Sequence, residues 1–344
     1  MSRFREEIGE QPEVAGRVLE AATPAVEAIA SRLRASPPTG FVIAARGSSD
    51  HAALYAKYLF GTRNRALVSL AAPSLFTHYG SGPDLAGACV IGISQSGASP
   101  DVIAVIEAAH GQGCPTVAVT NDAGSPLAQK ADLVVGLEAG PERSVPASKT
   151  YTASLLVMAL LSQALDPDPE FGAALARVPQ ALAAALRLDA DLDRLAPALL
   201  GPRAVVLGRG FNLSTAEEIA LKLTETSYVL ARAWSVADFE HGPIAVVDAG
   251  FPVLLIGAAG PVAGDLEEIA ERLEQYSCRV IGLFDGGAGP LGPEATVSLD
   301  SGLPEELTPL TLGVLGQLLA HRVALAHKID PDRPRALNKV TRTW

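Results

Sequence analysis

Two stretches of the chain, VIGISQSGASPD at residues 90–101 and VLLIGAAGPVAG at residues 253–264, stand at the same place in a repeated block. The segment 47–121 overlays the segment 210–284 without a gap, at a constant offset in residue number (210 − 47 = 163). Loops that drift independently would break this register, so the offset indicates a duplicated supersecondary block. The chain is therefore predicted to contain one structural unit twice.

The two copies keep their glycines and differ in their polar residues. Gly97 falls on Gly260 at this offset, but the residues before Gly97 read SQS, whereas those before Gly260 read GAA. Hydroxyl groups on a strand-to-helix turn add hydrogen-bond donors where the backbone already favours an anion. Because the hydroxyl-rich turn occurs once, we expect one anion site per chain.

Strand and helix patterns alternate within the first block. Apolar runs at 41–45, 90–93 and 116–120 predict strands, and the segment 50–60 predicts a helix. A further helix should begin at Ser99-Pro100-Asp101, which combines a hydroxyl cap, an early proline and an acid in the first turn. This alternation is typical of an α/β fold with helices on both faces of a parallel sheet.

The remaining segments are predicted to be largely helical. A leading helix should extend to about residue 33, and a long helix should lie around 307–327. The tail is rich in Pro and Arg, but Leu337 and Trp344 suggest that it is tied down. We divide the chain into an N-terminal helical segment (1–36), a first α/β domain (37–165), a helical linker (166–200), a second α/β domain (201–329) and a C-terminal tail (330–344).

Composition limits the class of protein. The chain has 344 residues, 48% of them hydrophobic, which leaves room for two cores of ordinary size. Its longest strongly apolar stretch, 153–165, is too short to span a bilayer and predicts a buried helix. The N-terminus alternates charges and has no apolar signal core, so we expect a cytoplasmic protein without a membrane partner.

Charge, cysteine and histidine patterns exclude further classes. A net charge of −11 without a basic run argues against nucleic acid as a partner. Cys89, Cys114 and Cys278 are widely spaced and odd in number, which favours reduced packing thiols over disulfides or a zinc site. We expect no metal and no other cofactor, because no ligand spacing is seen among His51, His110, His321 and His327.

Two turns of the first copy carry the polar residues expected of a phosphate site. They hold Ser94, Gln95, Ser96 and Ser99 in one turn, and Gly47, Ser48 and Ser49 in the other. Neutral donors and a helix dipole suit a phosphate monoester in an acidic protein. Either turn alone is an ordinary loop sequence, and neither is a Walker loop or a full dinucleotide fingerprint. The two together, at the carboxyl edge of one sheet, favour a phosphate site.

Several motifs in one order along the chain resemble sugar isomerase (SIS) domains. The similarity is greatest to the isomerase half of glutamine:fructose-6-phosphate amidotransferase, and it extends to stand-alone glucosamine-6-phosphate deaminases and ketose isomerases. The motifs are EIGEQP at 7–12, SQSG at 94–97, ERSVPASK at 142–149, LGRG at 207–210, ALKLTE at 220–225, HGP at 241–243 and Pro334-Arg335 with Lys339. The resemblance covers nearly the whole chain and implies two tandem SIS domains, each a flavodoxin-like parallel sheet flanked by helices.

The resemblance also implies roles for single residues. The serines and Gln95 of the two turns would form the phosphate shell, and Ser148 would lie in the loop that closes over the sugar. Glu225 falls on the base that moves a proton between C1 and C2, and Lys222 on the residue that polarises the terminal oxygens of the sugar. His241 falls on the ring-opening acid/base, which in the family reaches the site of a neighbouring subunit and so implies a homodimer with a shared active site.

Each catalytic candidate has a plainer alternative. Lys222 and Glu225 share one helix face and would be worth at most about 1 kcal/mol as an exposed salt bridge, but the flanking motifs favour catalysis. Lys339 falls on the tail lysine that meets the open-chain carbonyl in the family, whereas a terminal lysine is usually a solvated charge. His78 precedes His241 by the repeat offset (241 − 78 = 163) and is interpreted as its structural counterpart, without a catalytic role.

The resemblance implies an enzyme that isomerises and deaminates an amino-sugar 6-phosphate, with glucosamine 6-phosphate as the first candidate, to a ketose 6-phosphate and ammonia. One alternative is a phosphosugar ketose isomerase or a fructosamine-6-phosphate deglycase. Another is a sensor that binds a phosphosugar without turnover. The joint presence of Glu225, His241 and Lys339 counts against the sensor.

Three departures from the family pattern bear on the substrate. Pro146 replaces the usual alanine before the Ser/Thr-Lys pair, and Ala98 replaces the usual acid after SQSG. No glutaminase domain precedes the two copies in this sequence, and Met1-Ser2 offers no N-terminal cysteine nucleophile. We therefore expect no net transfer of ammonia from glutamine.

Overall fold

The computed structural model describes residues 2–287 and 289–339. The chain divides into two compact units, each built around one sheet. The first-sheet unit comprises residues 13–142, 149–176 and the tail residues 338–339. The second-sheet unit comprises residues 2–12, 143–148 and the described part of 177–337.

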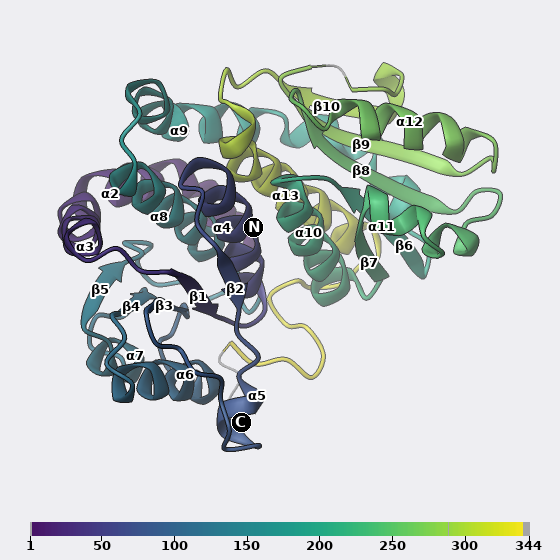
Figure 1. Ribbon diagram of the computed structural model, residues 1–344. Helices are drawn as coiled ribbons and strands as arrows, with labels where there is room; N and C mark the ends of the chain where they lie inside the picture. The colour runs from purple at the N-terminus through teal and green to yellow at the C-terminus, as the bar shows by residue number, and fades with distance from the viewer. Residues whose placement is uncertain (1, 288, 340–344) are drawn as a thin grey trace. The chain divides into compact units, whose positions relative to one another are not determined.

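The sheet of the first-sheet unit has five parallel strands in the order β2-β1-β3-β4-β5 (Figure 1). They are β1 (Gly40–Ala44), β2 (Val68–Leu70), β3 (Ala88–Ile93), β4 (Thr116–Thr120) and β5 (Leu133–Gly136). One face is covered by α3 (Thr23–Ala35), α4 (Ser48–Arg63) and α8 (Lys149–Leu165). The other face is covered by α5 (Ser74–Thr77), α6 (Pro100–Gly111) and α7 (Pro126–Lys130).

The sheet of the second-sheet unit repeats this order as β7-β6-β8-β9-β10, again with all pairs parallel. Its strands are β6 (Arg203–Gly208), β7 (Leu230–Ser235), β8 (Pro252–Ala258), β9 (Arg279–Asp285) and β10 (Thr296–Leu299). One face carries α10 (Asn212–Ser227) and α13 (Thr308–Ala326), which also packs against α1 (Arg3–Gly9). The other face carries α11 (Val236–Glu240) and α12 (Ala263–Glu274).

The predicted duplication is confirmed. The repeat offset carries β5 onto β10 and α6 onto α12 without a shift at either end. Both copies also tie the turn after their first strand to a later helix with the same kind of ion pair. Arg46 Nε lies 2.5 Å from Asp101 Oδ2, and Arg209 Nε lies 2.7 Å from Asp265 Oδ2. The predicted α/β fold with two parallel sheets is therefore correct.

The N-terminal prediction was wrong in detail, because the single leading helix is three helices. After α1, α2 (Gln11–Ala21) and α3 follow with breaks at Glu10 and Ala22. Pro12 and Pro24 each stand second in a new helix. Proline lacks a backbone N–H and fits the first turn of a helix better than its interior, so each proline favours a new start over continuation.

The segment predicted as a helical linker contains α9 (Pro169–Arg187), followed by short 3₁₀ turns. These turns and the others of the second-sheet unit are η1 (Asp189–Arg194), η2 (Ala196–Leu199), η3 (Pro243–Val246), η4 (Pro293–Ala295) and η5 (Glu305–Leu307). The apolar stretch singled out in the sequence lies in α8, which is buried over nearly its whole length.

One described stretch, Glu305–Ala326, has the length and a mean hydropathy of 1.2 that a membrane-spanning helix would need. Within its most apolar window, 83% of the residues are buried inside the protein. That burial is typical of a core helix, and the stretch includes α13, the central helix of the second-sheet unit.

All three cysteines are free thiols. Cys89 and Cys114 are buried, and Cys278 is partly exposed. Burial raises the pKa of the Cys89 thiol to about 12, so that this thiol stays protonated at neutral pH and is a poor nucleophile. Its environment is that of a packing residue.

Candidate functional site

The predicted phosphate turns follow neighbouring strands of the first sheet. β1 and β3 pair in parallel, with Ala44 opposite Gly92, so the turns that leave their carboxyl ends lie at one edge. The strand order reverses between β1 and β3. Ligands of open α/β sheets bind at this kind of switch point. The topology therefore brings the two turns together, as expected.

The SQSG turn is shaped by its glycine and presents several donors. Gly97 has φ +59, and a Cβ there would stand 2.0 Å from Ser125 Oγ, so only glycine fits. Within the described part of the chain, the N–H groups of Gln95 and Ser96 have no acceptor. Two amides and the flanking hydroxyls are thus available to an anion.

Ser99 begins α6 as expected, but its hydroxyl does not cap the helix. Ser99 Oγ instead lies 3.1 Å from Ser94 Oγ, in a hydrogen bond in which either can donate. This pairing holds two of the predicted phosphate ligands close together. The predicted cap was therefore right in position and wrong in its hydrogen bond.

The other turn begins α4 two residues earlier than predicted. Gly47 has φ +56 and precedes Ser48 and Ser49, which form the first residues of the helix. Asp50 stands in the same first turn. Burial raises its pKa, against the lowering effect of His51 and Arg46, so the acid beside the predicted phosphate turn is disfavoured as an anion.

Lys339 is held by a buried glutamate within the first-sheet unit. Its Nζ lies 2.6 Å from Oε2 of Glu142, whose side chain has no exposed surface. The two oxygens of Glu142 also accept hydrogen bonds from Oγ1 (2.8 Å) and N (3.1 Å) of Thr150, in the first turn of α8. Lys339 is therefore not a solvated terminal charge, and Glu142 is a residue of this site that the sequence analysis did not single out.

In the second-sheet unit, α10 places a buried lysine between two carboxylates. Lys222 is 1% exposed, and its Nζ lies 2.7 Å from Glu225 Oε2 and 3.4 Å from Glu218 Oε1. Glu218 is fully buried, whereas the side chain of Glu225 is 22% exposed. Oε1 of Glu225 has no donor among the described residues. The pair is thus a buried network with one accessible carboxylate oxygen and not a surface salt bridge.

Ser148 and His241 also belong to the second-sheet unit. Ser148 is fully buried, and its carbonyl accepts a hydrogen bond from Gln317 at 3.3 Å. The segment that carries it is held by Glu7, which accepts from the amides of Arg143 (2.5 Å) and Ser144 (3.2 Å). His241 follows α11 and is exposed. The roles of both residues stay predictions.

The C-terminal tail is anchored by polar contacts. Asp332 accepts from the first amides of α1, Arg3 N at 2.7 Å and Phe4 N at 2.9 Å. Arg335 contacts Tyr228, at the end of α10. Leu337, which was expected to help tie the tail down, is 40% exposed. Trp344 lies outside the described residues.

The corresponding turns of the second copy are occupied by a carboxylate of the protein itself. A Cβ on Gly260 would stand 2.2 Å from Oε2 of Glu305, and one on Gly210 would stand 3.4 Å from its Oε1. One side chain therefore reaches both glycines that match Gly97 and Gly47. The turn 257–260 of the second copy carries no hydroxyl side chain, in contrast to SQSG.

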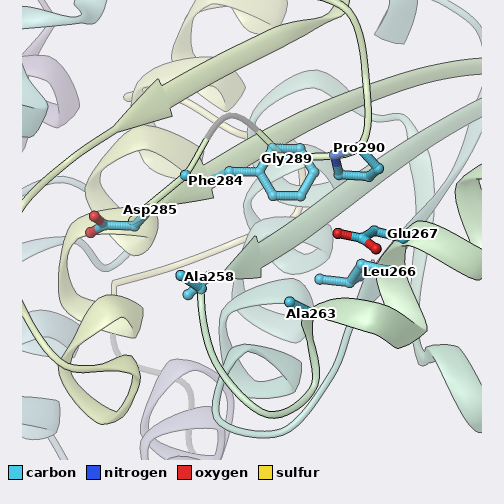
Figure 2. Close-up of a pocket in the computed structure, with 10 residues that line it drawn as sticks. Ala258, Ala263, Leu266, Glu267, Phe284, Asp285, Gly289 and Pro290 are labelled. Carbon is cyan, nitrogen blue, oxygen red and sulfur yellow. The ribbon is translucent and has the colours of Figure 1, made fainter.

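A cavity of about 270 Å³ opens near the carboxyl ends of β8 and β9, beside the same turn, since Ala258 and Ala259 line it (Figure 2). Among its described lining residues, the charged side chains are Glu267 and Asp285, and the rest are mainly apolar. In Figure 2, Asp285 points away from Phe284 and Glu267; its carboxylate accepts from Thr311 Oγ1 at 2.6 Å. Acidic walls disfavour a phosphate dianion, so this cavity does not fit the predicted ligand.

A doubly wound parallel sheet, present twice and carrying a hydroxyl-rich turn at one switch point, defines the class of sugar isomerase domains. The SIS domain family profile matches residues 40–164 and 201–326. The chain belongs to the SIS domain family.

The isomerizing glutamine–fructose-6-phosphate aminotransferase of Thermococcus kodakarensis is 32% identical over 345 residues, which cover 97% of this chain and 56% of that protein. The chain thus spans about half the length of the curated relatives it matches. A solved structure from Silicibacter pomeroyi DSS-3, provisionally named a phosphosugar isomerase, is 34% identical with a TM-score of 0.87, covering 96% of this chain and 100% of that one. Glucosamine-6-phosphate deaminase from Thermotoga maritima shares the fold at 20% identity (TM-score 0.79; 99% of this chain and 100% of that one).

Proposed function

We propose that the chain is a phosphosugar isomerase that converts an amino-sugar 6-phosphate, glucosamine 6-phosphate first among the candidates, to a ketose 6-phosphate and ammonia. The observation that carries the proposal is the pair on α10. One carboxylate oxygen of Glu225 has no donor among residues 2–287 and 289–339, while its other oxygen is held by the buried ammonium of Lys222. A fixed carboxylate beside a cation is suited to move a proton while negative charge develops on neighbouring oxygens.

The proposed reaction needs no redox partner. Glu225 removes the C2 proton of the open-chain aldehyde and returns it to C1. The resulting C2 imine takes up water and releases ammonia, which leaves a C2 ketone. Amino-sugar phosphate and water thus give ketose phosphate and ammonia, with atoms balanced.

The experiment is a substrate panel scored for two products. Glucosamine 6-phosphate, glucose 6-phosphate and fructosamine 6-phosphate are each assayed for ammonia and for fructose 6-phosphate. We expect both products from glucosamine 6-phosphate, and a loss of at least about 100-fold in rate in Glu225→Gln, since a positioned acid/base contributes about 10²–10⁴-fold.

The control for this variant is Glu107→Gln, which breaks an exposed ion pair with Lys130 in the other unit (2.8 Å). If glucose 6-phosphate gives fructose 6-phosphate and no substrate gives ammonia, the protein is a ketose isomerase. If only fructosamine 6-phosphate gives ammonia, it is a deglycase. Tight binding of all three without turnover would establish a sensor and refute an enzyme.

We further propose a homodimer in which His241 completes the site of the neighbouring subunit. Its exposure within the chain supports this role, since a ring-opening acid must reach a sugar. Mixing Glu225→Gln with His241→Asn subunits should restore about a quarter of wild-type activity, because random pairing gives half mixed dimers with one complete site each. No recovery after verified exchange would contradict a shared site.

A further inference from the structure

Glu142 and Glu305 are counterparts in the repeat. Each follows a proline soon after the last strand of its copy, and they stand at the offset that relates the two copies (305 − 142 = 163). Their contacts differ completely. Glu305 lies against Gly210 and Gly260, whereas Glu142 binds Thr150 and the tail lysine, Lys339.

The buried carboxylate of Glu142 receives a cation, Lys339, and neutral donors. Its carboxylate has no exposed surface, and the Thr150 amide and hydroxyl supply neutral donors. A buried carboxylate without a cation is costly, so the ammonium of Lys339 compensates a charge that Thr150 alone does not. In turn, the 2.6 Å contact fixes the position of a nitrogen at the end of a long, flexible side chain.

We propose that Glu142 places the amine of Lys339 and takes its proton when that amine adds to the substrate carbonyl; this inference rests on the proposed function. The Lys339 ammonium gives a proton to Glu142, and the neutral nitrogen forms a bond to the carbonyl carbon, giving a carbinolamine. Glu142 then returns the proton to the departing hydroxyl, which leaves as water. The products are a protonated imine on Lys339, one water and an ionised Glu142, so protons and electrons balance.

The substitution Glu142→Gln removes the ability to accept a proton while it keeps the size and shape of the side chain. Glu142→Gln keeps an acceptor oxygen of the same reach but can neither neutralise the ammonium nor accept its proton. Thr150→Val removes the hydroxyl donor and leaves the carboxylate facing Lys339. The repeat supplies a matched control in Glu305→Gln, and the exposed Glu107→Gln is a second.

The test is borohydride trapping with fructose 6-phosphate, with the modified peptide identified by mass spectrometry. Wild type should form one adduct per chain, on Lys339. Glu142→Gln should lower both the trapping rate and kcat by at least about tenfold while KM stays within about twofold, as expected for a lost acid/base group. Both controls should trap like wild type, and Glu142→Asp and Thr150→Val, which loses a hydroxyl donor to Glu142, should fall between wild type and Glu142→Gln.

Thermal melting and fructose 6-phosphate affinity check that each variant is folded. A folded Glu142→Gln that traps at the wild-type rate overturns the inference. If Glu142→Gln does not fold, Glu142→Asp is tested in its place. Its carboxylate is one methylene shorter, so trapping at the wild-type rate would contradict placement of Lys339 by Glu142. Wild-type turnover without any Lys339 adduct overturns the inference alone. Binding without turnover or adduct overturns the proposed function itself.

Discussion

The guanidinium of Arg335 lies 4.0 Å from the centre of the Tyr228 ring, and Arg335 N donates to the Tyr228 hydroxyl at 2.9 Å. Tyr228 ends α10 in a left-handed conformation (φ +57). This helix carries Lys222 and Glu225. The tail is thus fastened to the end of the helix that bears the proposed proton-transfer residues, a few residues before Lys339.

Tyr228→Ala is expected to free the tail. It removes both the hydroxyl acceptor and the ring, whereas Tyr228→Phe keeps the cation–π contact, worth about 0.5–1 kcal/mol at exposed sites. Trypsin should cut after Arg335 fastest in Tyr228→Ala, more slowly in Tyr228→Phe and slowest in wild type, as followed by mass spectrometry. Tyr276→Ala, at another partly exposed tyrosine, is the control. Equal cleavage of all four proteins would refute the anchoring role.

Ser96→Ala should weaken phosphosugar binding without unfolding the protein. Loss of one hydrogen bond to a charged group costs about 1.5–3 kcal/mol, which corresponds to an increase in Kd of about 10–150-fold. Calorimetry with fructose 6-phosphate measures the change, and Ser69→Ala on exposed β2 is the control. An unchanged Kd in Ser96→Ala would remove this serine from the phosphate shell.

Lys222→Met is expected to destabilise the second-sheet unit strongly. Two carboxylates would lose their shared cation, and breaking a buried pair from one side costs about 3–5 kcal/mol. Adding Glu218→Gln should recover part of the loss, because it removes the fully buried acid. Urea unfolding of both single variants and the double variant measures the coupling. Strict additivity would show that Glu218 and Lys222 do not interact.

Glu305→Gln should change the pH dependence of stability. Burial, followed by the charge of Glu306, raises the pKa of Glu305 above its ordinary value of 4.5. The folded state therefore binds the proton more tightly, so this contribution to stability is present below pH 4.5 and is lost as pH rises through the higher folded pKa.

At pH 7 the uncharged Glu305→Gln should consequently be at least as stable as wild type, and any advantage should vanish near pH 4. Urea midpoints at the two pH values measure this difference. The exposed Glu267→Gln serves as the comparison. An advantage that grows on acidification would show that the pKa is lowered instead.

The sequence was sufficient for the fold because the repeat and the apolar periodicity are local signals. Strand 116–120 was predicted with its observed bounds, and the hydroxyl-rich turn was placed at the carboxyl edge of the correct strands. Ser99 was predicted to start a helix, but its hydroxyl bonds Ser94 instead of the backbone. Propensity fixes where a helix begins, whereas the partner of a side chain depends on tertiary packing.

Long-range partners could not be read from the sequence. Glu218 and Lys222 are close neighbours on one helix, but their full burial depends on the helices packed around α10. Glu142 and Lys339 lie far apart in the chain, and no periodicity links a tail lysine to a buried acid. Two signals pointed to Glu142, since it begins the ERSVPASK motif and its Pro-Glu pair recurs at the repeat offset.

The Glu305 carboxylate against Gly260 has an evolutionary consequence. Replacing residues 257–260 by the sequence SQSG would not create a phosphate site in the second copy, since the negative charge of Glu305 would repel a phosphate dianion there. Glu305 would have to be substituted first, and that substitution alone would not create an anion site until the turn sequence also changed. A single acidic side chain of the second copy therefore opposes, at this turn, the anion binding proposed for the first copy.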